Sequence, residues 1–342
     1  MVDSPYGRIP SKPRADDIAR SANRITHEGA PSHIEEVSLA KMYSLKGDDN
    51  DTLRLMHHYG ISTCYSISDL TSASLPLRDA VPALAFEHDF LLSGLLAVTS
   101  LHLALLNPSA IHTNSAIKHH SQALALIRPH LTDVSPNNVA ALFSFSCLIA
   151  LYSFGFHQTD PSCSDPLREI LEVFTLIRGI RVIVKNGVQW LEQGPFAASM
   201  LPTPSNPNTG LPPEIEAIIS TLSERNSELT TDSTTQDAYA AAIGMLRQTF
   251  LLAAEKPGAK MMALPFPIMV PDEFMEKLSG RDPMALVILA HYGVVLYWLR
   301  GYIWLRGWGK ETVDAVKYAV GPEWRLCLEW AVEEVDSQDV AV

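Results

Sequence analysis

The chain of 342 residues carries 26 basic and 38 acidic side chains, which gives a formal net charge of −12. A domain that holds nucleic acid by itself normally presents a basic stripe, and the basic residues here are scattered, so we expect no direct binding of nucleic acid. The apolar fraction of 47% is typical of a globular protein, and this length can fill one sizeable core.

The first part of the chain is rich in Pro, Ser, Arg and Asp and has no apolar periodicity. It therefore predicts a disordered or weakly ordered tail over residues 1–47, with one short helix near 35–45. Residues 48–336 are predicted to form one domain, and residues 337–342 a C-terminal tail. The four cysteines, Cys64, Cys147, Cys163 and Cys327, form no C-x-x-C pair. This favours free thiols in a reducing compartment, cytoplasmic and/or nuclear.

Helical periodicity and capping signals dominate the first half of the domain. They predict helices over residues 51–61, 77–86, 88–106, 111–127, 140–156 and 167–184. Asp51 has the chemistry of an N-cap for the first of these. In the fourth, Ile117, Leu124 and Ile127 lie near one face. The fifth is apolar nearly all round, which is typical of a central helix.

The second half continues the helical pattern. Helices are predicted over residues 214–225, 237–254, 272–278, 283–305, 311–320 and 322–335. Loops are predicted over 202–213 and 226–236, and an extended connector around Pro265, Pro267 and Pro271. No segment alternates apolar and polar residues for long, so we expect no sheet. The predicted fold is an irregular all-α single domain with a central apolar helix and a hydrophobic pocket.

Two apolar stretches, residues 90–106 and 286–299, resemble membrane spans. The first is short for a bilayer and contains small and polar residues, and the second is shorter still and carries His291. We therefore predict two buried core helices and no membrane span.

Motifs of catalysis and metal binding are missing from the sequence. It contains no G-x-S-x-G or H-E-x-x-H motif. The adjacent pairs His57-His58 and His119-His120 point about 100° apart on a helix and cannot easily share one ion. We predict no metal and no cofactor.

A few polar groups inside apolar helices are the candidates for a binding site. His102 and His291 each need a partner, either a neighbouring helix or the hydroxyl of a bound apolar ligand. Arg178 has the same two alternatives, with Glu172 as its protein partner. Aromatic residues gather from Tyr292 to Trp308, either as ordinary core or as the wall of a pocket for a flat polycyclic molecule.

Several segments resemble the C-terminal regulatory region of fungal zinc-cluster transcription regulators, especially the sterol uptake control proteins. They are LRLMHHY (53–59), HDFLLSGLLAVTSLHLA (88–104), NVAALFSFS (138–146), IRGI (177–180) and LRGW (305–308), followed by Trp324 and Trp330. The resemblance implies a helical fold with a deep apolar pocket, which binds ergosterol in the sterol-responsive members. The six-cysteine DNA-binding module of that family is not readable here, as expected for a fragment or for a paralogue without that module.

Three hypotheses follow. The first is a regulatory module that binds a hydrophobic, sterol-like or polycyclic metabolite through His102, Phe143, Phe174, Arg178, His291, Tyr292 and Trp298. The second is a cofactor-free cyclase or isomerase that uses the same pocket, with His102, Arg178, His291 and Tyr292 as its polar groups. The third is a helical scaffold that pairs with a full-length regulator or co-regulator, or with a second copy as a homodimer.

Overall fold

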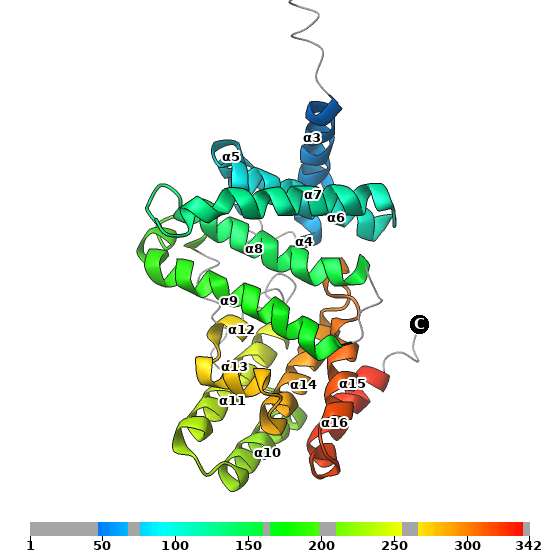
Figure 1. The fold of residues 1–342 in the computed structure, drawn as a ribbon. Coiled ribbons are helices and arrows are strands. Elements are labelled where there is room, and N and C mark those ends of the chain that lie inside the picture. The colour runs from blue at the N-terminus through cyan, green and yellow to red at the C-terminus, as the bar shows by residue number, and fades with distance from the viewer. Residues whose placement is uncertain (1–46, 68–75, 160–164, 198–209, 255–265, 338–342) are drawn as a thin grey trace, which may run out of the picture. The chain divides into compact units, whose positions relative to one another are not determined.

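The computed structural model describes residues 47–67, 76–159, 165–197, 210–254 and 266–337 (Figure 1). The chain divides into two units after Asp51, and only residues 47–51 of the first unit are described. Within the described ranges all regular structure is helical and no strand occurs, which confirms the all-α prediction. The predicted helix at 35–45, most of the loop at 202–213 and the C-terminal tail lie outside the described residues.

The first described helices are short and follow one another closely. They are α3 (Gly47–His58), the π-helix η1 (Tyr59–Thr63), α4 (Cys64–Ile67), the π-helix η3 (Pro76–Ala80) and α5 (Val81–Glu87). Helix α3 runs through Asp51, so the predicted N-cap at this residue is wrong. The fully buried Tyr59 donates its hydroxyl to the carbonyl of Leu77 at 2.7 Å, which ties η1 to η3.

The next three helices match the predicted ranges. They are α6 (Asp89–Leu106), α7 (Ala110–Ile127) and α8 (Val139–Phe156). Helix α6 packs against both α7 and α8. The residues that α7 buries are Ala116, Ala123 and Ile127, whereas Ile117 and Leu124 of the predicted apolar face are 41% and 38% exposed. Small side chains let α7 lie close to α6, and its larger apolar side chains are left at the surface.

Helices in the middle of the chain are longer than predicted. They are α9 (Pro166–Leu191), α10 (Pro213–Leu229) and α11 (Ser233–Ala254). The predicted loop at 226–236 is therefore wrong: only residues 230–232 separate α10 from α11. The connection is short because Asp232 caps the start of α11: its carboxylate accepts the backbone N–H of Thr235 at 2.8 Å.

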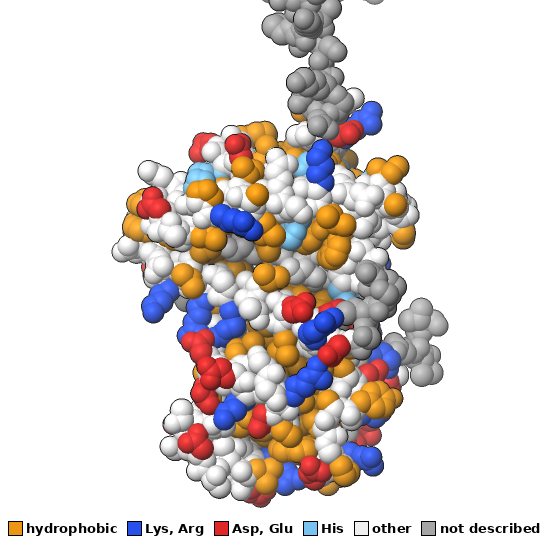
Figure 2. Space-filling model, viewed as in Figure 1, with side chains coloured by type: hydrophobic (Ala, Val, Ile, Leu, Met, Phe, Trp, Pro, Cys, Tyr) orange, Lys and Arg blue, Asp and Glu red, His pale blue; other side chains and the backbone are white. Residues whose placement is uncertain are grey.

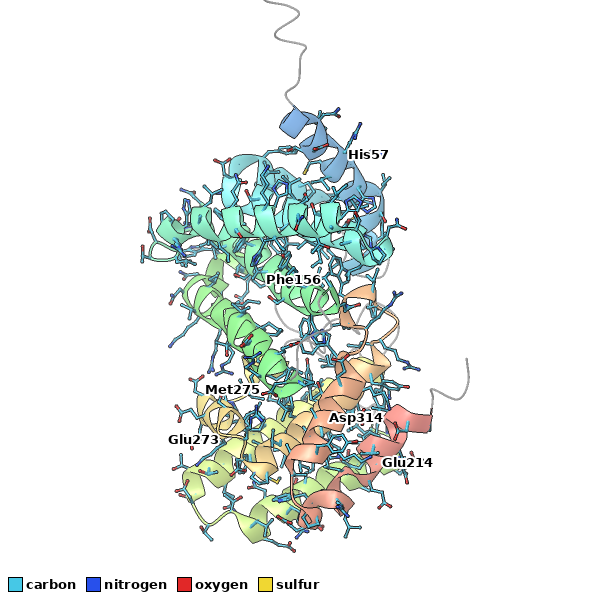
Figure 3. All side chains as sticks on the ribbon, turned by 45° about the vertical axis from the view of Figure 1, so that its right-hand side comes forward. His57, Phe156, Glu214, Glu273, Met275 and Asp314 are labelled. Atoms are coloured by element: carbon cyan, nitrogen blue, oxygen red, sulfur yellow. The ribbon has the colours of Figure 1, made fainter. Side chains whose placement is uncertain are left out.

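The proline-rich connector contains helix as well. It includes α12 (Phe266–Met269) and leads into α13 (Asp272–Ser279), where Figure 3 labels Glu273 and Met275. Helix α14 (Pro283–Trp298) ends earlier than the predicted residue 305, because the chain turns at residues 299–302. The remaining elements are η8 (Ile303–Leu305), α15 (Trp308–Ala319), η9 (Pro322–Trp324) and α16 (Arg325–Ser337).

Helix α14 is the most deeply buried element of the second unit. Every residue from Met284 to Tyr297 is buried, and the helix packs on α11, α15 and α16. Gly309 lets α15 approach closely, because a Cβ there would lie 2.3 Å from the backbone nitrogen of Tyr297. Helix α8 is also largely buried, as its composition predicts, and it contacts α6 and α9.

Two described helices, Asp89–Leu106 and Val139–Thr159, are long and apolar enough to cross a membrane by length and composition alone. In the structure 72% of the first and 61% of the second are buried inside the protein, as is usual for core helices. The burial predicted for 90–106 is confirmed, and α14, which covers most of 286–299, is also buried.

Candidate functional site

Helix α14 carries two adjacent polar residues, His291 and Tyr292, in the middle of the core. Its start is fixed by the Asp282 carboxylate, which accepts the backbone N–H of Met284 at 3.0 Å. Successive helical residues point about 100° apart, so the two side chains enter different surroundings. Both are at most 1% exposed, which makes any unpaired polar atom on them costly.

Tyr292 lies in an aromatic cluster made by α9, α12 and α14. Its ring stacks on Phe266 with a centroid distance of 4.6 Å and meets the edge of Phe174 at 5.7 Å. Its hydroxyl is buried and has no hydrogen-bond partner among the described residues, although buried hydroxyls normally have one. Burial raises the pKa of Tyr292, so the group is a neutral O–H that can both donate and accept.

Arg178 binds the segment from α12 to α13 that packs beside this aromatic cluster. Its Nη1 donates to the carbonyls of Pro267 at 2.7 Å and Val270 at 3.0 Å, and its Nη2 pairs with Asp272. The guanidinium thus binds the end of α12 and the start of α13. The expected partner Glu172 is wrong, since Glu172 lies beside Arg168 instead, at 3.8 Å.

His291 belongs to a second aromatic cluster on another side of α14. Its Nδ1 lies 2.8 Å from the carbonyl of Val287, so Nδ1 carries the proton and Nε2 is left as an acceptor. Nε2 is buried and no described residue bonds to it, and the ring stacks on Trp330 with a centroid distance of 6.0 Å. Burial lowers the pKa of His291 to about 4, which keeps the ring neutral. Trp298 lies nearby, with its ring 5.5 Å from Phe250, which also contacts Trp330 at 6.0 Å.

Thr312 adds a third unpaired polar atom at the contact between α14 and α15. The residue is fully buried, and its Oγ1 has no hydrogen-bond partner. It packs against Gly293, where a Cβ would lie 3.4 Å from the Cβ of Thr312. Within the described part of the chain, these polar atoms of Tyr292, His291 and Thr312 therefore have no hydrogen-bond partner.

His102 lies in separate surroundings on α6. Its Nδ1 is 3.0 Å from Oγ1 of Thr63, and its ring lies between His58 at 5.4 Å and Trp304 at 5.5 Å. Burial, and secondarily the charge of His58, lowers the pKa of His102 to about 4. Of the two alternatives for His102, the structure shows a hydrogen bond to a neighbouring helical segment, and the partner is Thr63, 39 residues earlier in the chain.

The predicted site residues thus fall into several groups. Phe174, Arg178 and Tyr292 meet around α12, His291 and Trp298 lie in the second aromatic cluster, and half-buried Phe143 packs on Phe196 at 5.4 Å. Phe266 was missed because its place beside Pro267 suggests an extended connector. Thr312 was missed because a single threonine in an amphipathic helix carries no local signal. Among the described residues no three His, Cys, Asp or Glu side chains are arranged to hold a metal ion.

Comparison with known proteins shows which proteins the chain is similar to. Residues 54–186 match the fungal specific transcription factor domain. A Zn(2)-C6 fungal-type transcription factor of Gibberella zeae is 27% identical over 310 residues, which is 82% of this chain and 61% of that protein. The Zn(2)-C6 fungal-type transcription factor afumD of Aspergillus fumigatus is 25% identical over 72% of this chain and 68% of its own length.

A third relative is the Sterol uptake control protein 2 of Saccharomyces cerevisiae, 28% identical over 40% of this chain and 16% of that protein. The chain spans less than two thirds of the length of the Gibberella zeae relative. Residues 54–186 therefore resemble the fungal specific transcription factor domain, and the predicted resemblance of the chain to the regulatory region of fungal zinc-cluster transcription factors is confirmed.

Proposed function

We propose that this chain is a ligand-responsive regulatory domain that binds a hydrophobic metabolite, sterol-like or polycyclic, in the aromatic cluster around Tyr292. The observation that carries the proposal is the unpaired hydroxyl of Tyr292, fully buried between Phe266 and Phe174. An unmet buried hydroxyl costs roughly 1–3 kcal/mol, and a ligand with one hydroxyl or carbonyl group would remove that cost.

The surroundings of the hydroxyl favour a flat, mostly apolar ligand. Phe266 stacks nearly parallel to Tyr292, with 18° between the rings, so the face of Tyr292 already accepts a planar group. A ligand that took this place would displace Phe266 together with the short helix α12. Because Arg178 binds the end of α12 and the start of α13, movement of α12 would be transmitted to α13, which packs on α11 and α14.

The relatives guide the choice of the first probe. One of them is named for the control of sterol uptake, so ergosterol is the natural starting molecule. The transcription factor relatives also fit a nuclear or cytoplasmic place of action for this chain. In this proposal the ligand shifts an equilibrium between two packings of α12, and it does so only by its difference in affinity for them.

The test is a thermal-shift and native mass spectrometry comparison of wild type and Tyr292→Phe, with ergosterol and with the matching hydrocarbon that lacks the hydroxyl. We expect ergosterol to raise the melting temperature of the wild type and the hydrocarbon to do so much less. In Tyr292→Phe the two molecules should have equal effects, at least about tenfold weaker than that of ergosterol on wild type if one hydrogen bond of about 1.4 kcal/mol is lost.

The substitution has an internal control. Since the hydroxyl is unpaired without ligand, Tyr292→Phe should leave the free protein as stable as wild type or slightly more stable. A wild type that binds neither molecule overturns the proposal. Binding followed by conversion of the bound molecule would favour the cyclase or isomerase hypothesis instead.

A further inference from the structure

Trp330 of α16 packs on the buried His291 of α14. Helix α16 lies beside α14 among the lower helices of the view (Figure 1). The indole of Trp330 is half-buried and runs parallel to the imidazole of His291, with 8° between the rings and 6.0 Å between their centroids. Figure 2 shows hydrophobic side chains among charged ones over this lower group of helices. Trp330 therefore contacts both the solvent and a buried polar ring.

The imidazole of His291 presents one buried acceptor on this side of α14. Its Nδ1 donates to the carbonyl of Val287 at 2.8 Å, so Nε2 carries a lone pair and no proton. No described residue bonds to Nε2, which is buried. A buried acceptor without a partner is costly, and only a donor removes that cost. The geometry at His291 thus calls for an O–H or N–H group.

The two tryptophans of this aromatic cluster are held differently. The indole N–H of Trp298 donates to a carboxylate oxygen of Glu334 at 2.8 Å, which fixes that ring. No described residue accepts the indole N–H of Trp330. Packing on His291 and on the ring of Phe250, at 6.0 Å, holds it instead. Trp330 is therefore the ring of this cluster that can move without breaking a hydrogen bond.

A displaced Trp330 has an apolar place to go. Side chains of a helix point toward its preceding turn, and Leu326 lies one turn before Trp330. The side chain of Leu326 is 80% exposed, so the indole can rotate onto it and stay partly shielded from water. This rotation would open the place next to Nε2 of His291 from the solvent side.

The place that the indole fills sets the chemistry of a molecule that would take it. It has the shape of a flat bicyclic ring, bordered by the imidazole of His291 and the ring of Phe250. Helix α16 carries four acidic side chains and one basic side chain, which disfavours an anionic molecule. We propose that a neutral, planar bicyclic aromatic molecule binds in place of the Trp330 indole and donates one hydrogen bond to Nε2 of His291.

This site is separate from the cluster around Tyr292. That cluster is made with α9 and α12, whereas the His291 site is made with α11 and α16. The two sites also differ in chemistry, because a tyrosine hydroxyl pairs with either a donor or an acceptor and Nε2 of His291 pairs only with a donor. The proposal is therefore independent of ligand binding at Tyr292, and both sites can be filled at once.

The test is isothermal titration calorimetry of the full chain near pH 7 with three probes of one ring system: β-naphthol, its methyl ether and β-naphthoate. We expect β-naphthol to bind. The methyl ether should bind at least about tenfold more weakly, because it has no proton to donate. The naphthoate should bind more weakly than β-naphthol because of its negative charge. Saturating ergosterol should leave the affinity for β-naphthol unchanged.

Variants assign the hydrogen bond to its residue. His291→Phe should bind β-naphthol and the methyl ether equally, since the acceptor is gone. Tyr239→Phe is the matched control: it removes another buried polar atom, on α11, and should keep the preference for β-naphthol. Circular dichroism establishes that both variants are folded, and the comparison of probes on wild type needs neither of them.

Four results would each overturn the proposal. They are a wild type that does not bind β-naphthol, a wild type that binds the methyl ether equally well, a preference that survives in His291→Phe, and displacement of β-naphthol by ergosterol. The last would place the probe in the cluster around Tyr292. A wild type that ignores ergosterol but prefers β-naphthol would contradict the proposed function alone.

Discussion

The Nε2 of His157 lies 2.7 Å from a carboxylate oxygen of Glu311, a residue 154 positions later in the chain. The Nδ1 of the same ring pairs with the carboxylate of Glu169. One imidazole therefore joins η5 (His157–Thr159), at the end of α8, to the first turns of α9 and α15. Its ring also packs on Trp308 at 4.4 Å. The hydrogen bond to Glu311 and the charges of Glu311 and Glu169 raise the pKa of His157 against the opposing effect of burial.

His157 should make stability depend on pH above about 6.5. Its folded pKa lies above the unfolded value of about 6.5, so its contribution is complete below pH 6.5 and is lost as pH rises through the folded pKa. We expect His157→Gln, which keeps hydrogen-bonding capacity without the charge, to cost more stability near pH 6 than near pH 9. Urea unfolding of both proteins across this range measures the difference.

The control for this experiment is His57→Gln, a change at an exposed residue of α3 that is labelled in Figure 3. It should cost less stability near pH 6 than His157→Gln does, because an exposed side chain makes few contacts. If the loss of unfolding free energy caused by His157→Gln does not change with pH, the charge of the ring does not contribute. The packing of the ring on Trp308 would then explain the whole effect.

His291 should act in the opposite pH range. Burial lowers its pKa to about 4, so between pH 6.5 and 4 the unfolded chain binds a proton that the folded chain does not. Stability contributed by the neutral ring is therefore lost as pH falls below 6.5, by on the order of 3 kcal/mol at the lower end. We expect His291→Phe, which can still stack on Trp330, to be less sensitive to acid than wild type. Equal slopes of unfolding free energy between pH 6.5 and 5 in both proteins would refute this.

The helices themselves could be predicted because their signals are local. Asp165-Pro166 and Asp282-Pro283 start α9 and α14, and in both cases the aspartate accepts a backbone N–H of the first turn. The side of a helix that becomes buried depends on the helix that packs against it. The sequence of one helix alone does not show which helix that is, so the buried side could not be predicted. Helix α7 buries Ala116 and Ala123 rather than Ile117 because close packing on α6 favours small residues there.

The candidate site was less predictable for the same reason. The polarity of His102, Arg178 and His291 inside apolar segments marked these side chains as groups that need partners. Their partners lie far away in sequence or are missing: Arg178 binds carbonyls 89 and 92 residues later, and Nε2 of His291 has none. Only the fold brings Phe266 onto Tyr292, so no local pattern could have placed it there.

Arg178 should be irreplaceable by lysine. The guanidinium bonds two carbonyls and a carboxylate at once, and a lysine ammonium on a flexible stem cannot reproduce this fork. We expect Arg178→Lys to destabilise the protein by about 1–3 kcal/mol and to speed hydrogen exchange in α12 and α13. Arg181→Lys is the matched control, since Arg181 makes a bond to Asp272 at 3.1 Å from a more exposed position. Equal effects of the two substitutions would show that the surface pair with Asp272 accounts for the role of Arg178.

Gly309 should be the least replaceable glycine of the core. A Cβ at this residue would lie 2.3 Å from the backbone nitrogen of Tyr297 and 2.5 Å from its Cα, and a backbone cannot move aside as a side chain can. Alanine would therefore force α15 away from α14 and expose part of the most buried helix, at a cost of at least about 3 kcal/mol.

Gly244→Ala is the comparison, because Gly244 lies within α11 and nothing comes within 4 Å of its Cβ position. There alanine should stabilise the helix by roughly 0.5–1 kcal/mol. Urea unfolding should thus shift in opposite directions for two identical substitutions, and a shift in the same direction would show that the α14–α15 contact is looser than its geometry implies.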